Sequence, residues 1–220
     1  MKGFVGCLES ILQGFRLEVL AEVAGAEPRR IGELDRAALK VAMGVAALDG
    51  QAQTSFIYDC NGELITEYKG TENRVMISLG AMPVTLRNAF VAVEDARFYS
   101  HNGVDLKRIV GAFVSNLSSS STQGGSTITQ QLIKNTLLSA EQSYKRKIQE
   151  AWLAMQLEMK YSKDEILESY LNTIYLDMGQ YGIKTGAEYY FGKDADQLSV
   201  AEIAAILGIT NNPSLFSPYV

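Results

Sequence analysis

The sequence predicts a mainly α-helical domain with one small β-hairpin near its N-terminal side. Apolar residues recur at the spacing of amphipathic helices over most of the chain beyond residue 80. Asn61-Gly62 lies between β-prone runs at 54–58 and 63–68, and this dipeptide is typical of a tight hairpin turn. No internal repeat is visible, and the length suits one good-sized domain.

Each expected helix has its own start signal. Pro83 suits a first turn and Asp105 suits an N-cap, and both precede apolar stripes. The Ser-x-x-Glu pattern at Ser162 and Ser199 is that of a capping box. Residues 118–125 are too polar to pack and should form a mobile loop. The expected helices begin near Pro83, Asp105, Ser126, Glu141, Ser162 and Ser199. In the long helix from 141 to 160, the residues expected to face inward are Tyr144, Ile148, Ala151, Trp152, Met155 and Met159.

The chain divides at about residue 53. Residues 1–53 carry no chemical motif and should be helical or poorly ordered, whereas residues 54–220 form the folded domain. One face of a helix near the start is apolar and comprises Leu8, Ile11, Leu12, Phe15 and Val19. Such a face fits either a packed or partner-binding helix or a helix lying on a membrane surface. The longest charge-free apolar run in this segment, residues 41–48, is far shorter than the ~20 residues that span a bilayer.

The composition limits which kinds of catalytic and metal-binding site this chain can carry. The chain has 220 residues and a net charge of −5, which argues against a dedicated nucleic-acid binder. Cys7 and Cys60 are too few and too far apart for a disulfide scaffold or a zinc site. Because the sequence has a single histidine, His101, carboxylates, lysines, arginines and hydroxyls must carry most of any chemistry.

Glu94 is the first chemical candidate, in the stretch Glu94-Asp-Ala-Arg97-Phe. It should lie at the C-terminal end of the helix that Pro83 begins, where carbonyl dipoles disfavour a charged carboxylate. That setting suits a general acid or base. On periodicity alone, a solvated Glu-Asp pair with Arg97 as its partner is the simpler interpretation.

Residues 124–131, Gly-Gly-Ser-Thr-Ile-Thr-Gln-Gln, place hydroxyls and amides at a helix start, and Lys134 follows one turn later. Free N–H groups, hydroxyls and an ammonium at a helix N-terminus suit a phosphate or diphosphate. A polar N-cap after a flexible linker explains the same residues equally well.

Arg146 and Lys147 precede Glu150 by four and three residues, so the three share one helical face. A solvated face with weak ion pairs is one interpretation. The other is a pair of cations that grip a diphosphate, with Glu150 holding them in place or binding a bridging metal.

In order and spacing, these motifs resemble the peptidoglycan glycosyltransferase family. These are the glycosyltransferase family 51 domains of class A penicillin-binding proteins and of monofunctional transglycosylases. A fourth motif is similar to Lys163-Asp-Glu-Ile-Leu-Glu-Ser-Tyr-Leu-Asn172, and a fifth to Ala201-Glu-Ile-Ala-Ala-Ile-Leu-Gly208 followed by Pro213. The resemblance implies a mostly helical, lysozyme-like fold with two lobes.

The resemblance also implies a reaction, the polymerisation of lipid II into glycan strands with inversion at C1 of the donor sugar and release of undecaprenyl diphosphate. Glu94 matches the family glutamate that deprotonates the 4-hydroxyl of the acceptor, and Glu150 matches the second family glutamate. The positions that match family residues binding substrate or diphosphate are Arg97, Ser126, Thr127, Gln130, Lys134, Arg146, Lys147 and Lys163. A divalent cation, Mg²⁺ or Mn²⁺, is compatible with Glu150, and the motifs leave open whether a metal is required.

The partners implied by the resemblance are lipid II, the growing glycan strand, the membrane surface and other cell-wall synthesis or division proteins, with no nucleic acid. The implied location is the extracytoplasmic face of a bacterial cell membrane, although no anchor or transpeptidase domain is visible in this chain and the domain looks shortened at its C-terminus. Two other functions stay open. One is a lysozyme-like glycan-cleaving enzyme, because a lone glutamate in a helical cleft suits that chemistry too. The other is a non-catalytic fragment that binds lipid II or a cell-wall partner.

Overall fold

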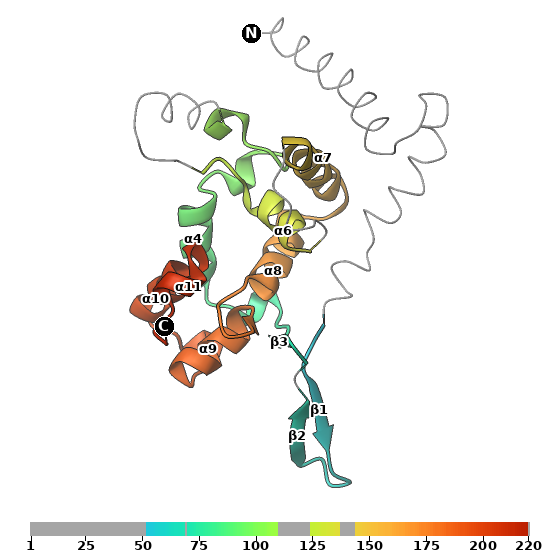
Figure 1. Ribbon diagram of the computed structural model, residues 1–220, viewed down its shortest axis with the longest axis vertical. Coiled ribbons are helices and arrows are strands. Elements are labelled where there is room, and N and C mark those ends of the chain that lie inside the picture. Colours follow the sequence, from blue (N-terminus) through green and yellow to red (C-terminus); the bar gives the residue numbers. More distant parts are fainter. Residues whose placement is uncertain (1–51, 69, 110–123, 137–143, 220) are drawn as a thin grey trace, which may run out of the picture.

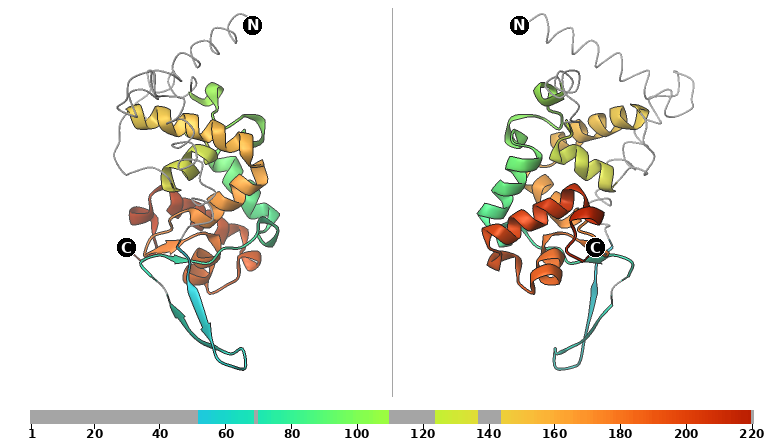
Figure 2. Two further views of the ribbon diagram at one scale, coloured as in Figure 1. Left: turned by 90° about the vertical axis from the view of Figure 1, so that its right-hand side faces the viewer. Right: turned by 60° about the vertical axis from the view of Figure 1, so that its left-hand side comes forward.

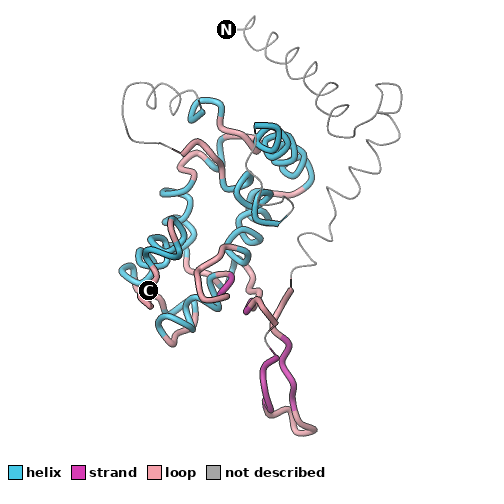
Figure 3. Tube along the Cα trace, in the orientation of Figure 1, coloured by secondary structure: helices cyan, strands magenta, loops and turns pink. Residues whose placement is uncertain are grey.

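The computed structural model describes residues 52–68, 70–109, 124–136 and 144–219. Figure 1 shows a mainly helical body from which a two-stranded hairpin projects, and Figure 3 separates helices from strands by colour. The predicted fold class is therefore confirmed. Nearly all of the predicted N-terminal segment, with its apolar face, and most of the loop predicted at 118–125 lie outside the described residues.

The hairpin consists of β1 (Ser55–Tyr58) and β2 (Leu64–Tyr68), which pair antiparallel. Asp59 holds the turn between them, because its Oδ1 accepts the backbone N–H of Asn61 at 2.8 Å and that of Glu63 at 2.7 Å. Gly62 follows with a φ of 84°, in the region that favours glycine. The turn predicted from Asn61-Gly62 is confirmed.

Seven α-helices lie wholly within the described ranges, and two short strands connect distant parts of the chain. The helices are α4 (Val84–Glu94), α6 (Ile128–Thr136), α7 (Tyr144–Lys160), α8 (Lys163–Thr173), α9 (Ile183–Phe191), α10 (Val200–Asn211) and α11 (Pro213–Phe216). Three 3-10 turns accompany them, η2 (Leu79–Ala81), η3 (Phe98–Ser100) and η4 (Ala195–Gln197). Strand β3 (Asn73–Arg74) pairs in parallel with β4 (Gln180–Tyr181). In the part of the chain described, no helix combines the length and apolar character needed to cross a membrane.

The start signals predicted at Asp105, Ser162 and Ser199 are used as expected, whereas Pro83 is the N-cap residue just before α4 and the start expected near Glu141 lies outside the described residues. At Ser162 and Ser199 the serine side chain accepts the N–H of the glutamate three residues on, and that glutamate accepts the serine N–H in return, so both capping boxes form. Asp105 caps in the same way, since its Oδ1 accepts the backbone N–H of Arg108 at 3.0 Å, and residues 106–109 are helical.

The inward face of α7 differs from the prediction. Met159 is 81% exposed, whereas Leu153, Ala154 and Leu157 enter the core. Glu150 lies on the same helical face as these three residues and is 1% exposed. The helix is therefore rotated so that a carboxylate, rather than the predicted Met159, faces the interior.

The core forms where α6 packs against α7 and α8, and where α4 packs against α10 (Figure 2). Phe90 of α4 and Tyr170 of α8 meet edge to face, with ring centroids 6.4 Å apart and planes at 73°. Both side chains are at most 1% exposed, and so are Ile128 and Leu132 of α6. Burying side chains of this size stabilises each by about 1.5–3 kcal/mol, so the packing fixes α4 against α8.

Candidate active site

Glu94 is the last residue of α4, at the helix end that the sequence predicted. Its Oε2 accepts a hydrogen bond of 2.8 Å from the side-chain amide of Gln131 on α6. Its backbone carbonyl accepts a hydrogen bond from the guanidinium of Arg108. The carboxylate is thus only partly buried and held by an uncharged donor, while a cation covers the carbonyl end of its helix.

Asp95, the next residue, is fully buried and has a structural part. Its Oδ2 lies 2.8 Å from His101 Nε2 and accepts the backbone N–H of Ile128 at 3.1 Å. Because Ile128 is the first residue of α6, this carboxylate ties the start of α6 to the end of α4. The arrangement brings Gln131, one turn along α6, to the Glu94 carboxylate.

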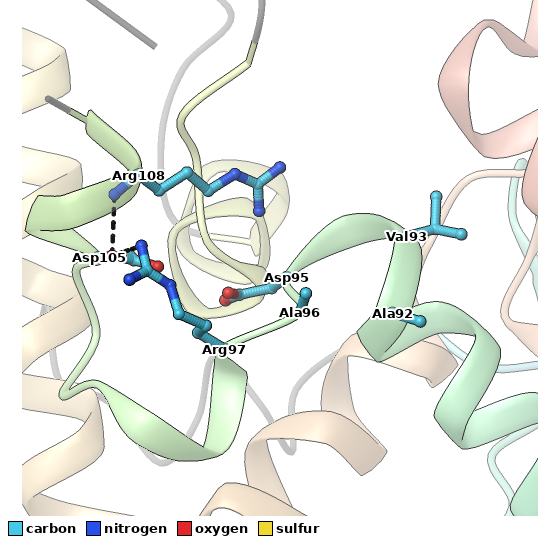
Figure 4. A pocket seen from close by; sticks show the side chains of 7 residues that line it. All are labelled: Ala92, Val93, Asp95, Ala96, Arg97, Asp105 and Arg108. Carbon is cyan, nitrogen blue, oxygen red and sulfur yellow. Dashed lines mark hydrogen bonds and ion pairs between the residues drawn. The ribbon is translucent and has the colours of Figure 1, made fainter. Parts of the chain in front are cut away.

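The chain neighbours of Glu94 on both sides belong to a pocket that is lined by Ala92, Val93, Asp95, Ala96, Arg97, Asp105 and Arg108 (Figure 4). Its charged wall is organised by Asp105, whose Oδ1 accepts from the Arg97 guanidinium at 2.6 Å and from the Arg108 backbone at 3.0 Å. Burial opposes ionisation of Asp105, but the Arg108 N–H and the Arg97 charge outweigh it and hold the pKa of this carboxyl below its ordinary value. The pocket therefore offers two guanidinium groups, and that of Arg108 contacts the backbone carbonyl of Glu94.

Thr127 and Gln130 brace the start of α6 from inside. The Gln130 side chain accepts the Thr127 N–H at 3.1 Å, and the Thr127 hydroxyl accepts the Gln130 N–H at 3.2 Å. The Thr127 hydroxyl also donates to the carbonyl of Gly103 at 2.6 Å. Both side chains are at most 2% exposed, so these two predicted binding residues are buried in a capping network.

Lys147 connects α7 to the same helix start. Its ammonium donates to the Ser126 hydroxyl at 2.8 Å and to Glu150 Oε1 at 2.5 Å. The Lys147 side chain is 51% exposed while that of Glu150 is 1% exposed. A buried carboxylate thus forms an ion pair with a lysine whose side chain is half exposed to solvent.

Lys163, at the start of α8, lies 2.7 Å from Glu158 Oε2, and its ammonium stands 4.4 Å above the ring of Phe98. Glu158 also accepts from the hydroxyl of Thr129 on α6 at 2.5 Å. These contacts link the first turn of α6 to the end of α7 and the start of α8.

Comparison with known proteins decides the family. The family model described as transglycosylase matches residues 61–220, which contain every residue of the site above. The chain belongs to the transglycosylase family.

Similar proteins are much longer than this transglycosylase chain. Penicillin-binding protein 1A/1B of Bacillus subtilis is 48% identical over 167 residues, covering 75% of this chain and 18% of that protein. Penicillin-binding protein 1A of Streptococcus pneumoniae is 46% identical over 169 residues, covering 76% and 23%. That of Clostridium botulinum is 44% identical over 172 residues, covering 76% and 21%. The chain therefore spans about a fifth of the length of these relatives.

The transglycosylase fold brings most of the sequence-predicted residues to one place, between the end of α4 and the starts of α6 and α7. Lys134 is exposed in the last turn of α6, and the side chain of Arg146 lies outside the described residues. Sequence reasoning missed Asp95, Arg108, Gln131 and Tyr170. Asp95 follows Glu94 in the sequence, and Gln131 and Tyr170 lie within motifs already quoted. Only their contacts in the structure distinguish these residues from the rest of each motif.

The acidic residues of the transglycosylase site have partners other than a metal. Among the described residues there is no group of three or more His, Cys, Asp or Glu side chains that could hold an ion. Glu150, the predicted metal ligand, already has its charge balanced by Lys147. Within the described ranges, no protein site for a divalent cation is therefore assembled around Glu150.

Proposed function

We propose that this chain is a peptidoglycan glycosyltransferase that polymerises lipid II into glycan strands, with Glu94 as its general base. One observation carries the proposal. Glu94 ends α4 with its carboxylate held by Gln131, and its chain neighbours on both sides line a pocket with two arginines, in a chain of the transglycosylase family. The names of the relatives, penicillin-binding proteins 1A and 1A/1B, support an activity in cell-wall synthesis.

In the proposed reaction, Glu94 takes the proton from the 4-hydroxyl of the acceptor sugar. The oxygen then bonds to C1 of the donor MurNAc from the face opposite the leaving group, which inverts the configuration. The bond from C1 to the diphosphate breaks, and its electron pair leaves on undecaprenyl diphosphate. Because a diphosphate leaves as a stable anion, no second carboxylic acid is needed to protonate it, unlike the sugar alcohol released in glycan cleavage.

The charge that develops on the diphosphate needs cations in a fixed arrangement. Arg97 of the pocket and Lys147 of α7 supply two of these cations. Glu150 holds Lys147 in position beside Ser126, just before α6. Thr127 and Gln130 act through the helix start that they brace. The remaining proposed contacts to the diphosphate come from Lys134, Arg146 and Lys163.

The substrate sets the proposed location. Lipid II carries an undecaprenyl tail, so we place the working enzyme at the membrane surface, on the extracytoplasmic face where glycan strands are assembled. Lipid II and the growing strand are then its two reactants, and other cell-wall synthesis or division proteins its neighbours.

Turnover of lipid II tests the function. Wild-type protein should convert lipid II into polymeric glycan, and Glu94→Gln should lower kcat about 10²–10⁴-fold because it removes the base while keeping the shape. Glu188→Gln, which neutralises an exposed glutamate on α9, is the matched control and should keep full activity. Unchanged activity of Glu94→Gln would contradict the proposal. Shortening of preformed glycan would instead favour a cleaving enzyme, and calorimetric binding of lipid II without any product would favour a non-catalytic fragment.

A further inference from the structure

Tyr170 on α8 begins a chain of hydrogen bonds that ends at Glu94. Its hydroxyl donates to Oε1 of Gln131 on α6 at 3.2 Å. The amide nitrogen of the same Gln131 donates to Oε2 of Glu94 on α4 at 2.8 Å. Tyr170 is 1% exposed, and its ring is fixed against Phe90. Three helices are therefore connected through one glutamine amide.

The chemistry of the three groups gives the chain a direction. An ionised carboxylate only accepts hydrogen bonds, so Gln131 must turn its NH₂ toward Glu94. Its carbonyl then faces Tyr170, which must donate. Burial, and then the charge of Glu94, raise the pKa of Tyr170 above its ordinary value, so its hydroxyl keeps the proton it donates.

We propose that Tyr170 is a positioning residue for the glycosyl transfer, which fixes the Gln131 amide so that it donates to the ionised Glu94. The inference rests on the proposed function and deepens it. Tyr170 lies behind Gln131 and acts on the base only through that amide.

Removing the hydroxyl releases the amide. In Tyr170→Phe the Gln131 amide keeps its contact with Glu94 but loses the hydroxyl that holds its carbonyl, so it also samples the orientation with the carbonyl toward Glu94. In that orientation two acceptors repel each other unless the carboxyl binds a proton. The other charged or titratable groups of the site, namely Arg97, Arg108, Asp95, Asp105 and His101, are unchanged by the substitution. The base is then protonated over a wider pH range, and the variant loses rate at the acid end of the profile.

Kinetics with a matched tyrosine give the first test. Tyr170→Phe should lower kcat about tenfold, keep KM within about twofold, and move the acid limb of the pH–rate profile to higher pH. The control Tyr190→Phe also removes one partly buried tyrosine hydroxyl. That hydroxyl lies away from the site and donates to the Leu176 carbonyl at 2.5 Å, so its loss should change neither kcat, KM nor the pH–rate profile. A Tyr170→Phe enzyme with the wild-type profile overturns the proposal, and so does an equal loss in both variants.

The second test needs no turnover. In protein labelled with ¹⁵N-glutamine, the side-chain amide signals of Gln131 should shift with pH as the carboxyl they contact titrates. Glu94→Gln should abolish that shift, and Tyr170→Phe should reduce it and speed proton exchange, while Tyr190→Phe leaves both intact. Signals unaltered in Tyr170→Phe overturn the positioning chain. A wild-type protein that fails to polymerise lipid II overturns the proposed function alone, because the amide signals report on the chain directly.

Discussion

At the scale of single residues, a buried carboxylate with an exposed partner is the main feature that residue type alone did not reveal. The pattern placed Arg146, Lys147 and Glu150 on one face but left open whether that face meets solvent. The structure buries Glu150 almost completely and leaves Lys147 half exposed. Helical spacing predicts which residues share a face of one helix. Whether that face is buried depends on which other helices pack against it, and these come from distant parts of the sequence.

Lys147→Met tests this pair. It leaves a buried carboxylate without its cation, so the free energy of unfolding should fall by about 1–3 kcal/mol in urea titrations. Lys134→Met, which replaces an exposed lysine on α6, should change it by less than about 0.5 kcal/mol. Adding Glu150→Gln to Lys147→Met should recover part of the loss, since a neutral amide costs less to bury. A Lys147→Met protein as stable as wild type would show that the ion pair contributes nothing.

At the scale of elements, the segment 96–104 that follows α4 is a connector packed closely against the backbone of α7. Gly103 lies in it with a φ of 83°, and a Cβ there would come within 2.6 Å of the Ala154 backbone in α7. Its carbonyl accepts the Thr127 hydroxyl that braces α6. The sequence pattern predicts no such part for Gly103, because neither the positive φ nor the approach to α7 leaves a trace in periodicity.

Gly103→Ala should therefore destabilise the protein through both backbone strain and crowding. Gly192, at the end of α9, has a φ of 63°, and a Cβ there would meet no described atom within 4 Å, so Gly192→Ala measures strain alone. Strain of this kind costs about 1–2 kcal/mol, and crowding against backbone adds about 1–3 kcal/mol. In urea titrations Gly103→Ala should lose clearly more stability than Gly192→Ala. Equal losses in the two variants would show that the connector has room at α7.

At the scale of the whole molecule, local signals predicted more than long-range ones. The hairpin turn, both capping boxes and the Asp105 cap depend on a few neighbouring residues, and all of them formed as expected. The rotation of α7 and the contacts of Gln131 depend on segments distant in sequence, so the pattern could not supply them. For the site, the motifs singled out Glu94 and Lys147, but only packing shows that Asp95 and Tyr170 hold the elements around Glu94.

The molecule as a whole should be most stable between about pH 5 and pH 10, because its shifted groups act at the two ends of the scale. Glu202 has its pKa lowered from 4.5 to about 2, first by the Lys193 side chain and then by the Ser199 N–H and hydroxyl. The pKa values of Asp59, Asp105 and Glu165 are lowered as well. Since a carboxyl with a lowered pKa binds fewer protons folded than unfolded, its stabilisation is present above the unfolded value and is lost as pH falls toward 2.

At the alkaline end of the pH–stability profile, the free energy of unfolding falls as the pH rises, the opposite of its behaviour at the acid end. Burial raises the pKa of Tyr99, Tyr181 and Tyr190 above 10.0, so the unfolded chain releases these protons first and stability falls as pH rises past that value. Urea titrations from about pH 2 to about pH 11 should trace both limbs. Glu202→Gln should make the acid limb shallower while Glu188→Gln leaves it unchanged, because the Ser199 cap and Lys193 act on the pKa of Glu202. An acid limb of the same depth in both variants would mean that the capping box at Ser199 does not couple protonation to folding.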